Sequence, residues 1–272
     1  MEHRVIAFIG AGNMARSIIS GLLKSGYPAS SIIATNRTTE KNTLLTDTFG
    51  IEATPDVKTA IKKADVVVLG VKPQGMEDLL SSVSDLSFDG KLVISIAAGI
   101  TVSRLNDMVG QTLNLVRTMP NTPSLVGLGM TGLYAPANVS EKDRDYAGDL
   151  LSATGKICWV DEESDINSII AAAGSAPAYF FLFMEAMEAE ARRMGFEADM
   201  ARTLVQQSAL GAAQMVVANP ETTLETLRSQ VTSKGGTTAE AIKVFNDKQL
   251  SETVSEAMKA AVNRAKEMES LF

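Results

Sequence analysis

Hydrophobic positions in residues 1–160 gather into short uninterrupted runs, and stretches with helical spacing lie between them. Residues 64–71, 91–97 and 113–119 are such runs, which is typical of strands that are buried on both faces of a parallel sheet. Segment 102–109, between two of these runs, has helical character. Regular alternation of strands and helices predicts an α/β fold with a doubly wound parallel sheet.

The pattern changes near residue 164. Two further short strands are predicted at 132–134 and 157–160, and no strand pattern follows them. Alanine, methionine and glutamate dominate the rest of the chain. Long helices are predicted at 178–194, 201–218 and 252–269. The sequence therefore predicts two domains, an α/β domain over residues 1–164 and an all-α domain over residues 165–272.

One predicted helical segment, residues 171–187, is apolar around most of its circumference. A helix of this kind has to be buried, because no side of it favours water. The helical half of the chain is too small to bury it well, so we expect a second copy of the chain to cover it. Packing of this helix against the α/β domain of a monomer is the alternative.

The first strand pattern leads into a glycine-rich turn. Residues 4–9 are followed by the sequence GAGNMA at residues 10–15 and then by a helical pattern. In a turn of this type, Gly10 allows the tight bend, Gly12 lets phosphates approach the backbone, and Ala15 lets the helix pack on the strand. Free N–H groups at the helix start would bind a pyrophosphate. We interpret the turn as a dinucleotide site; an ordinary strand-to-helix turn is the alternative.

The residues after the second predicted strand, 31–35, indicate which dinucleotide is bound. An NAD site usually places an acidic residue there, which binds the ribose hydroxyls. This chain has Asn36 and Arg37 instead, and an arginine can bind a phosphate through two parallel hydrogen bonds. NADP is therefore favoured as the cofactor. A solvated Arg37 in a site that accepts NAD equally well is the alternative.

Composition and charge narrow the classes of partner. The chain has 272 residues, of which 45% are hydrophobic and 21% are charged, as in a soluble globular protein. A net charge of −7 disfavours binding to nucleic acid and to anionic membranes. We also expect no signal peptide and no apolar run long enough to span a membrane.

Cysteine and histidine each occur once in the sequence, as Cys158 and His3. A single cysteine permits no disulfide within the chain, which fits a reducing cytoplasm, and its apolar neighbours predict a buried thiol. His3 precedes the first strand, far from the strand ends at which chemistry is expected. The sequence has no clustered His and Cys ligands, so we expect no metal site and no histidine-based mechanism.

Three further loops follow predicted strands. Residues 71–73 and 97–99 should lie at the same edge of the sheet as the glycine turn. Lys72, in the first of these loops, could contact the nicotinamide half of a cofactor or be a surface lysine. Residues 119–123 form a loop that two prolines make stiff. It could present its polar side chains to a ligand or be a rigid strand-exit turn.

Residues 231–240 stand out in the helical half. Two adjacent glycines would let the backbone turn, and a helix is predicted to begin at Thr237 or Thr238. Thr237 and Glu240 have the spacing of a capping box. The N–H groups and hydroxyls that converge here could bind a small carboxylate. A helix cap without a ligand is the alternative.

Together, these motifs resemble the pyrroline-5-carboxylate reductase family over essentially the whole chain. Residues 231–238 carry the resemblance most strongly, with Lys234 where the family signature has proline. Supporting matches lie at residues 8–14, 71–73, 95–99, 119–123 and 174–179. In the last of these, Ala176 stands where glycine is usual. The resemblance implies a Rossmann domain followed by a helical domain that interlocks two subunits, with the active site at the dimer interface.

The family also implies roles for single residues. NADP, with NADPH preferred over NADH, would contact Ile9, Gly10, Ala11, Gly12, Asn13, Met14, Asn36, Arg37, Gly70, Val71, Lys72, Pro73, Ala97, Ala98 and Gly99. The substrate carboxylate would bind at Ser233, Gly236 and Thr237. Thr238 would form a hydrogen bond to the ring nitrogen and is the candidate catalytic residue. The implied assembly is a homodimer that can associate into larger homo-oligomers.

The resemblance implies reduction of 1-pyrroline-5-carboxylate to L-proline by NADPH, the last step of proline biosynthesis, in the cytoplasm. An imine needs little acid–base help because its nitrogen can take a proton from solvent, so orientation would supply most of the catalysis. A 3-hydroxy-acid dehydrogenase of similar plan is one alternative, but it would need a lysine base that residues 174–175 do not offer. A non-catalytic NADP-binding regulatory protein is the other.

Overall fold

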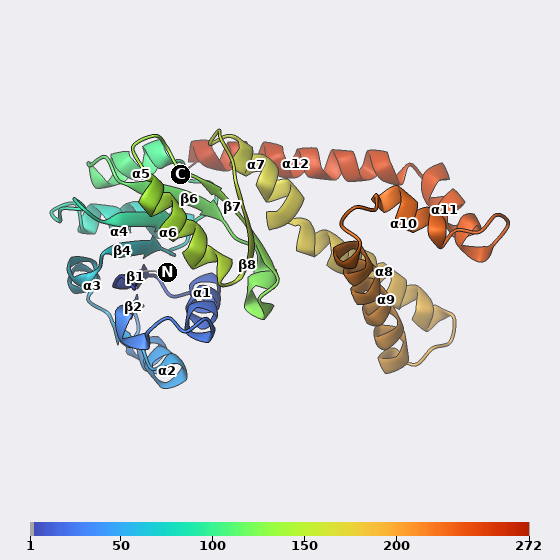
Figure 1. Cartoon of the computed structure of the whole chain (residues 1–272), viewed down its shortest axis with the longest axis horizontal. Helices are drawn as coiled ribbons and strands as arrows, with labels where there is room; N and C mark the ends of the chain where they lie inside the picture. Colours follow the sequence, from blue (N-terminus) through green and yellow to red (C-terminus); the bar gives the residue numbers. More distant parts are fainter. Residues whose placement is uncertain (1–2, 272) are drawn as a thin grey trace. The chain divides into compact units, whose positions relative to one another are not determined.

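The computed structural model of the protein describes residues 3–271. Its contacts group the chain into two compact units (Figure 1). The sheet unit runs up to Pro177 and takes in the last turns of the chain from Ala261 onward. The helical unit is Ala178–Ala260. The chain therefore passes between the units twice, once after Pro177 and once after Ala260.

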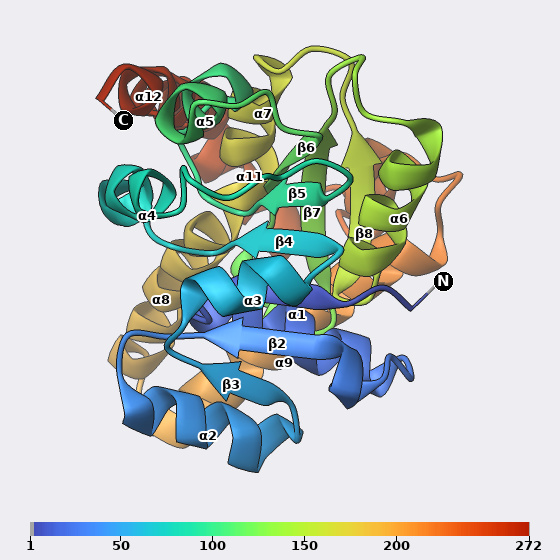
Figure 2. The ribbon, with the colours of Figure 1, turned by 90° about the vertical axis from the view of Figure 1, so that its left-hand side faces the viewer.

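Within the described residues, the sheet unit is built on one eight-stranded sheet in the order β3-β2-β1-β4-β5-β6-β7-β8 (Figure 2). The strands are β1 Ile6–Ile9, β2 Ile32–Thr35, β3 Glu52–Thr54, β4 Val66–Leu69, β5 Leu92–Ser95, β6 Leu115–Met119, β7 Gly129–Tyr134 and β8 Gly155–Trp159. Neighbouring strands are parallel except β6 and β7, which are antiparallel. The predicted doubly wound α/β fold is confirmed, with this one antiparallel pair as an addition.

Helices cover both faces of the sheet. They are α1 Asn13–Lys24, α2 Thr39–Phe49, α3 Val57–Lys63, α4 Met76–Ser82, α5 Val102–Val109 and α6 Glu141–Ser152. Apolar side chains of α1, α2 and α6 pack on one face, and those of α3, α4 and α5 pack on the other. All four residues of β4 are fully buried, as the uninterrupted apolar run predicted.

The sequence pattern did not reveal β3, α2, α4 or α6. Strand β3 has three residues, its Glu52 is exposed, and it lies at the edge of the sheet, so it carries no apolar run. Helix α2 buries only Asn42 and Leu45, which leaves it without a clear apolar face. Elements that bury few side chains leave a weak hydrophobic pattern.

The composition changes at residue 164, whereas the contacts change only after Pro177. Helix α7, Asp165–Ile169, and the π-helical turn Ile170–Gly174 belong to the sheet unit. A Cβ atom on Gly132 of β7 would lie 2.6 Å from Cγ2 of Ile169, so this glycine allows α7 to pack closely on the sheet. The amide of Asn121 donates to the carbonyl of Ala173, at 3.0 Å, and holds the π-helical turn.

The helical unit contains the predicted long helices. They are α8 Ala176–Arg193, α9 Ala198–Ala218, α10 Leu224–Gln230, α11 Thr237–Asp247 and α12 Leu250–Leu271, of which the last turns belong to the sheet unit. Within the described chain, no side chain of α8 is buried. Even its large apolar side chains are exposed: Phe180 is 68%, Phe181 62% and Leu182 66% exposed. The apolar circumference of this helix is therefore left open to a further partner.

One continuous helix over Asp165–Arg193, 29 residues, is long and apolar enough to cross a membrane. The expectation that no segment reaches this length is wrong, because α7, the π-helical turn and α8 join without a break. Length and composition alone are weak support for a membrane span. The first part of this helix packs on the sheet through Ile169, as a helix of a globular domain does.

Candidate functional site

A cavity of about 430 Å³ opens at the carboxyl ends of the central strands. Strand β1 pairs with β2 on one side and with β4 on the other, so the chain changes direction across the sheet at this point. Ligands of doubly wound folds bind at such a switch point. The cavity is lined by Ile9, Gly10, Gly12, Thr35, Asn36, Arg37, Thr38, Lys41, Pro55, Val57, Gly70, Val71, Asp78, Leu79 and Ser82.

The glycine turn has the geometry that close approach of a phosphate requires. Gly10 has φ +88°, and a Cβ atom there would lie 2.7 Å from Cγ2 of Val71. A Cβ atom on Gly70 would lie 2.5 Å from the carbonyl oxygen of Gly10, so both positions need glycine. Gly12 precedes the first residue of α1, and a Cβ atom on it would have no other heavy atom within 4 Å. This open space lies next to the N–H groups at the start of α1, which have no partners within the helix, and sites of this kind bind phosphates.

The end of β2 supplies the polar side of the cavity. Arg37 and Lys41 bring two cationic side chains to its lining. Nη2 of Arg37 lies 3.6 Å from the position that a Cβ atom on Gly75 would take, which places the guanidinium beside the loop after β4. The amide of Asn42 donates to the carbonyl of Asn36, at 3.1 Å, and holds the backbone of this turn.

Sequence reasoning missed eight of the lining residues, which are Thr35, Thr38, Lys41, Pro55, Val57, Asp78, Leu79 and Ser82. Lys41 lies in the first turn of α2, four residues after Arg37, which precedes this helix, so a prediction of α2 would have placed Lys41 near the end of β2. Asp78 lies in the first turn of α4, far along the sequence from Arg37 and Lys41. No local pattern indicates its place.

The remaining predicted cofactor residues lie near the same edge of the sheet but do not line this cavity. Ala11, Asn13 and Met14 belong to the glycine turn and the start of α1. The other residues follow β4 and β5 and are Lys72, Pro73, Ala97, Ala98 and Gly99. Their role as cofactor contacts stays a prediction, and these loops extend the edge of the sheet from β4 toward β5.

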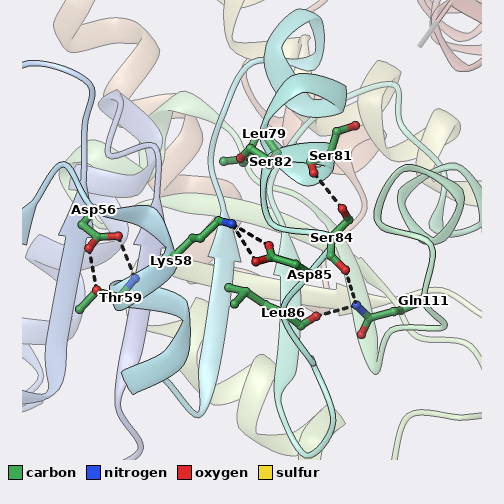
Figure 3. A network of polar contacts seen from close by, with 10 residues as sticks. All are labelled: Asp56, Lys58, Thr59, Leu79, Ser81, Ser82, Ser84, Asp85, Leu86 and Gln111. Atoms are coloured by element: carbon green, nitrogen blue, oxygen red, sulfur yellow. Dashed lines mark hydrogen bonds and ion pairs between the residues drawn. The ribbon is translucent and has the colours of Figure 1, made fainter.

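A polar network supports the wall that α4 contributes (Figure 3). Leu79 and Ser82 line the cavity, and the hydroxyl of Ser82 donates to the carbonyl of Leu79 at 2.6 Å. The ammonium of Lys58, on α3, donates to both carboxylate oxygens of Asp85, at 2.7 and 2.9 Å. These hydrogen bonds hold the pKa of Asp85 below its usual range. The exposed ion pair ties α3 to the loop that follows α4.

The four predicted substrate residues lie together on one turn of the helical unit. Helix α11 begins at Thr237, and the turn before it is closed by a hydrogen bond from the N–H of Gly236 to the carbonyl of Ser233, at 3.0 Å. A Cβ atom on Gly236 would lie 2.7 Å from the hydroxyl of Ser233, so a larger residue there would displace this hydroxyl. The turn and the first two residues of α11, Thr237 and Thr238, therefore lie at the N-terminal end of this helix, where N–H groups without intrahelical partners are found.

The predicted capping box at this turn is wrong. The N-cap position is Gly236, which has no side chain, and Thr237 is already the first helical residue. A box with Glu240 would need Thr237 as the N-cap, one position later than the N-cap in the structure. Because no side chain caps the helix, its first N–H groups stay available to an anion.

Other predicted features concern Cys158, His3 and metals. The thiol of Cys158 is only half-buried, and burial raises its pKa, which opposes a nucleophilic role. The His3 ring contacts the ring of Tyr27, with centroids 5.0 Å apart, before the start of β1. Among residues 3–271, no group of three or more His, Cys, Asp or Glu side chains could hold a metal ion.

The sheet order, the glycine turn and the cationic lining define a dinucleotide-binding oxidoreductase fold. Residues 5–99 match the family model described as NADP oxidoreductase, coenzyme F420-dependent. Residues 163–268 match the model described as pyrroline-5-carboxylate reductase dimerisation.

Similar proteins cover the chain along its whole length. A pyrroline-5-carboxylate reductase of Vibrio alginolyticus is 61% identical over 272 residues, with 100% of both chains covered. A solved structure of this reductase from Coxiella burnetii is similar with a TM-score of 0.92 and 41% identity, over 98% of this chain and 99% of that one. The reductase of Plasmodium falciparum, solved with NADP bound, is similar with a TM-score of 0.88 and 26% identity, over 99% of each chain. The chain belongs to the pyrroline-5-carboxylate reductase family.

Proposed function

We propose that the chain reduces the C=N bond of 1-pyrroline-5-carboxylate to L-proline, with NADPH as the preferred hydride donor. Membership of the family makes the chain an NAD(P)H-dependent oxidoreductase. It excludes the alternative interpretation of the chain as a 3-hydroxy-acid dehydrogenase. The observation that carries the cofactor preference is the lining at the end of β2, where Arg37 and Lys41 take the place of the acid that an NAD site needs.

In this proposal, each group of residues has one task. The glycine turn at Gly10 and Gly12 holds the pyrophosphate, and Arg37 with Lys41 holds the ribose 2′-phosphate. The start of α11 holds the substrate carboxylate, and the Thr238 hydroxyl orients the ring nitrogen. When bound, the dinucleotide supplies the hydride that adds to the imine carbon. The residues themselves supply orientation, while the proton on the nitrogen comes from solvent.

A steady-state assay with the imine and each reduced dinucleotide tests this function. We expect turnover with both donors and a kcat/KM about tenfold or more higher with NADPH, since a charge-assisted hydrogen bond contributes about 1.5–3 kcal/mol. Equal efficiency with NADH would contradict the cofactor preference. Tight NADPH binding without any turnover of the imine would instead support the regulatory protein. Oxidation of a 3-hydroxy acid with NADP⁺ serves as the control and should be undetectable.

We also propose that the chain is a homodimer, and that residues 165–272 serve as its dimerisation and substrate domain, in the cytoplasm. The open apolar side chains of α8, Phe180, Phe181 and Leu182, support a second copy as the partner. Further association of dimers into larger homo-oligomers would use surfaces outside this helix.

Light scattering after size exclusion should therefore give a mass of at least twice the chain's 28.9 kDa. The reason is that, within residues 3–271, no side chain of α8 is buried. Phe181→Glu should shift the population toward the monomer and lower the specific activity, because a charge on this face has to be desolvated in the dimer. A stable monomer of 28.9 kDa with full activity would contradict the dimer.

A further inference from the structure

A buried arginine lies on β6, an interior strand of the sheet. Arg117, on β6, is the largest fully buried side chain among the described residues and is 1% exposed. Its guanidinium stays charged in a protein, so burial is costly unless carboxylates accept its hydrogen bonds. Nη1 lies 2.9 Å from Oε1 of Glu163, and Nη2 lies 2.8 Å from Oε1 of Glu269. The predicted cofactor and substrate sites do not include any of these residues.

Glu163 connects this arginine to the segment that follows a predicted cofactor loop. Oε1 of Glu163 also accepts the N–H of Val102, at 2.8 Å. Val102 is the first residue of α5, only three positions after Gly99. The carboxylate therefore holds the start of α5 beside β6, and with it one end of the loop that contains Ala97–Gly99.

Glu269 brings the last turns of α12 to the same loop. Its Oε2 accepts a hydrogen bond from the amide of Asn167, at 3.3 Å. The neighbouring Met268 lies against Gly99, where an added Cβ atom would be 2.9 Å from Cβ of Met268 and 3.1 Å from its Cε. Gly99 has φ +75°, so the loop bends at the point of contact. The end of α12 therefore packs against the loop of residues 97–99.

We propose that Arg117, Glu163 and Glu269 are positioning residues that hold residues 97–99 in the shape required by the nicotinamide half of the cofactor. The inference rests on the proposed function, in which residues 97–99 contact NADPH. Arg117 acts at a distance: it fixes two carboxylates, one of which holds the start of α5 while the other holds the Met268 side chain against the loop. Loosening the network would reduce the fraction of chains with a competent loop, and apparent affinity falls by that fraction.

Glu269→Gln tests the proposal with little change of shape, and the same helix offers a matched control. Glu267 forms an exposed ion pair with Arg264, with both side chains 62% exposed, so Glu267→Gln makes the same chemical change away from the network. Two probes are titrated into each variant. NADPH occupies the whole site, whereas adenosine 2′,5′-bisphosphate occupies only the part lined by Arg37 and Lys41.

We expect Glu269→Gln to raise the Kd of NADPH about tenfold and to leave the Kd of the bisphosphate within about twofold, since weakening a charged hydrogen bond has an effect of this order. Glu267→Gln should change neither constant. An equal loss of affinity for NADPH and for the bisphosphate would mean that the network only stabilises the fold. Unchanged affinity for both probes would mean that the network does not position the loop. Both results overturn the proposal.

A second variant covers the case in which Glu269→Gln does not fold. Met268→Ala leaves the ion pairs intact and removes the contact with Gly99, so it should produce the same difference between the two probes. Unchanged binding of NADPH by Met268→Ala would overturn the proposal independently. A wild-type protein that turns over the imine while these variants behave normally would refute only this inference, whereas a wild-type protein without turnover would refute the proposed function.

Discussion

Thr238→Ala should lower kcat/KM for the imine about 5- to 150-fold, while the affinity for NADPH stays nearly unchanged. The substitution removes a hydroxyl that can form a hydrogen bond to the ring nitrogen, a loss of about 1–3 kcal/mol. It keeps the backbone N–H that helps to hold the carboxylate. Since Gly236 is the N-cap and Thr238 is the second helical residue, alanine removes no cap, and the free energy of unfolding should hardly change.

Two companion variants make this result specific. Thr238→Ser restores the hydroxyl and should recover most of the activity. Thr253→Ala changes another exposed threonine, in the first turn of α12, and should have wild-type kinetics. Wild-type kcat/KM in Thr238→Ala would remove this residue from the site. A variant that lost NADPH binding instead would show that the turn serves the cofactor rather than the substrate.

Arg37→Asp should lower kcat/KM for NADPH about 10- to 150-fold and change the value for NADH by less than about threefold. The guanidinium lines the cavity at the end of β2, where a 2′-phosphate would lie, and aspartate replaces this attraction with repulsion. NADH has no phosphate at that position, and an aspartate there can accept hydrogen bonds from its ribose hydroxyls. The measurement is the ratio of kcat/KM for the two donors at a fixed imine concentration.

Lysines inside and outside the cavity provide the comparison for this variant. Lys41→Gln removes the second cation of the lining and should shift the ratio in the same direction by a smaller factor. Lys156→Asp makes the same reversal of charge on an exposed residue of β8 that does not line the cavity, and it should leave the ratio unchanged. Equal loss for NADPH and NADH in Arg37→Asp would reject the assignment of this residue to the 2′-phosphate.

Local features of the sequence were sufficient for much of the fold and for part of the site. The strand, the glycine turn and the helix around Gly10 and Gly12 have a spacing that depends only on neighbouring residues, and the predicted turn lines the cavity. Arg37 was predictable for the same reason, because it directly follows a strand with a clear apolar pattern. The turn from Ser233 to Thr238 was found from its glycines, but its cap was assigned one residue too late.

Features that join distant segments were decided by the tertiary structure alone. Arg117 meets Glu163 and Glu269, which are 46 and 152 positions away, and no periodicity marks such a pairing. Asp78 and Lys41 line the cavity at the carboxyl ends of the central strands because α4 and α2 pack beside it. The antiparallel direction of β7 likewise depends on how the chain returns to the sheet.

There is a physical reason why some features were predictable from the local sequence and others only from the tertiary structure. A hydrophobic period and a glycine turn depend only on neighbouring residues. The sequence by itself therefore determined the α/β class and the glycine turn after the first strand, and it predicts a phosphate-binding role for Arg37. Burial of a charge and the backing of a loop depend on which elements become neighbours. Only the tertiary structure therefore decided that the last turns of α12 lie against Gly99 and that Arg117 holds them there.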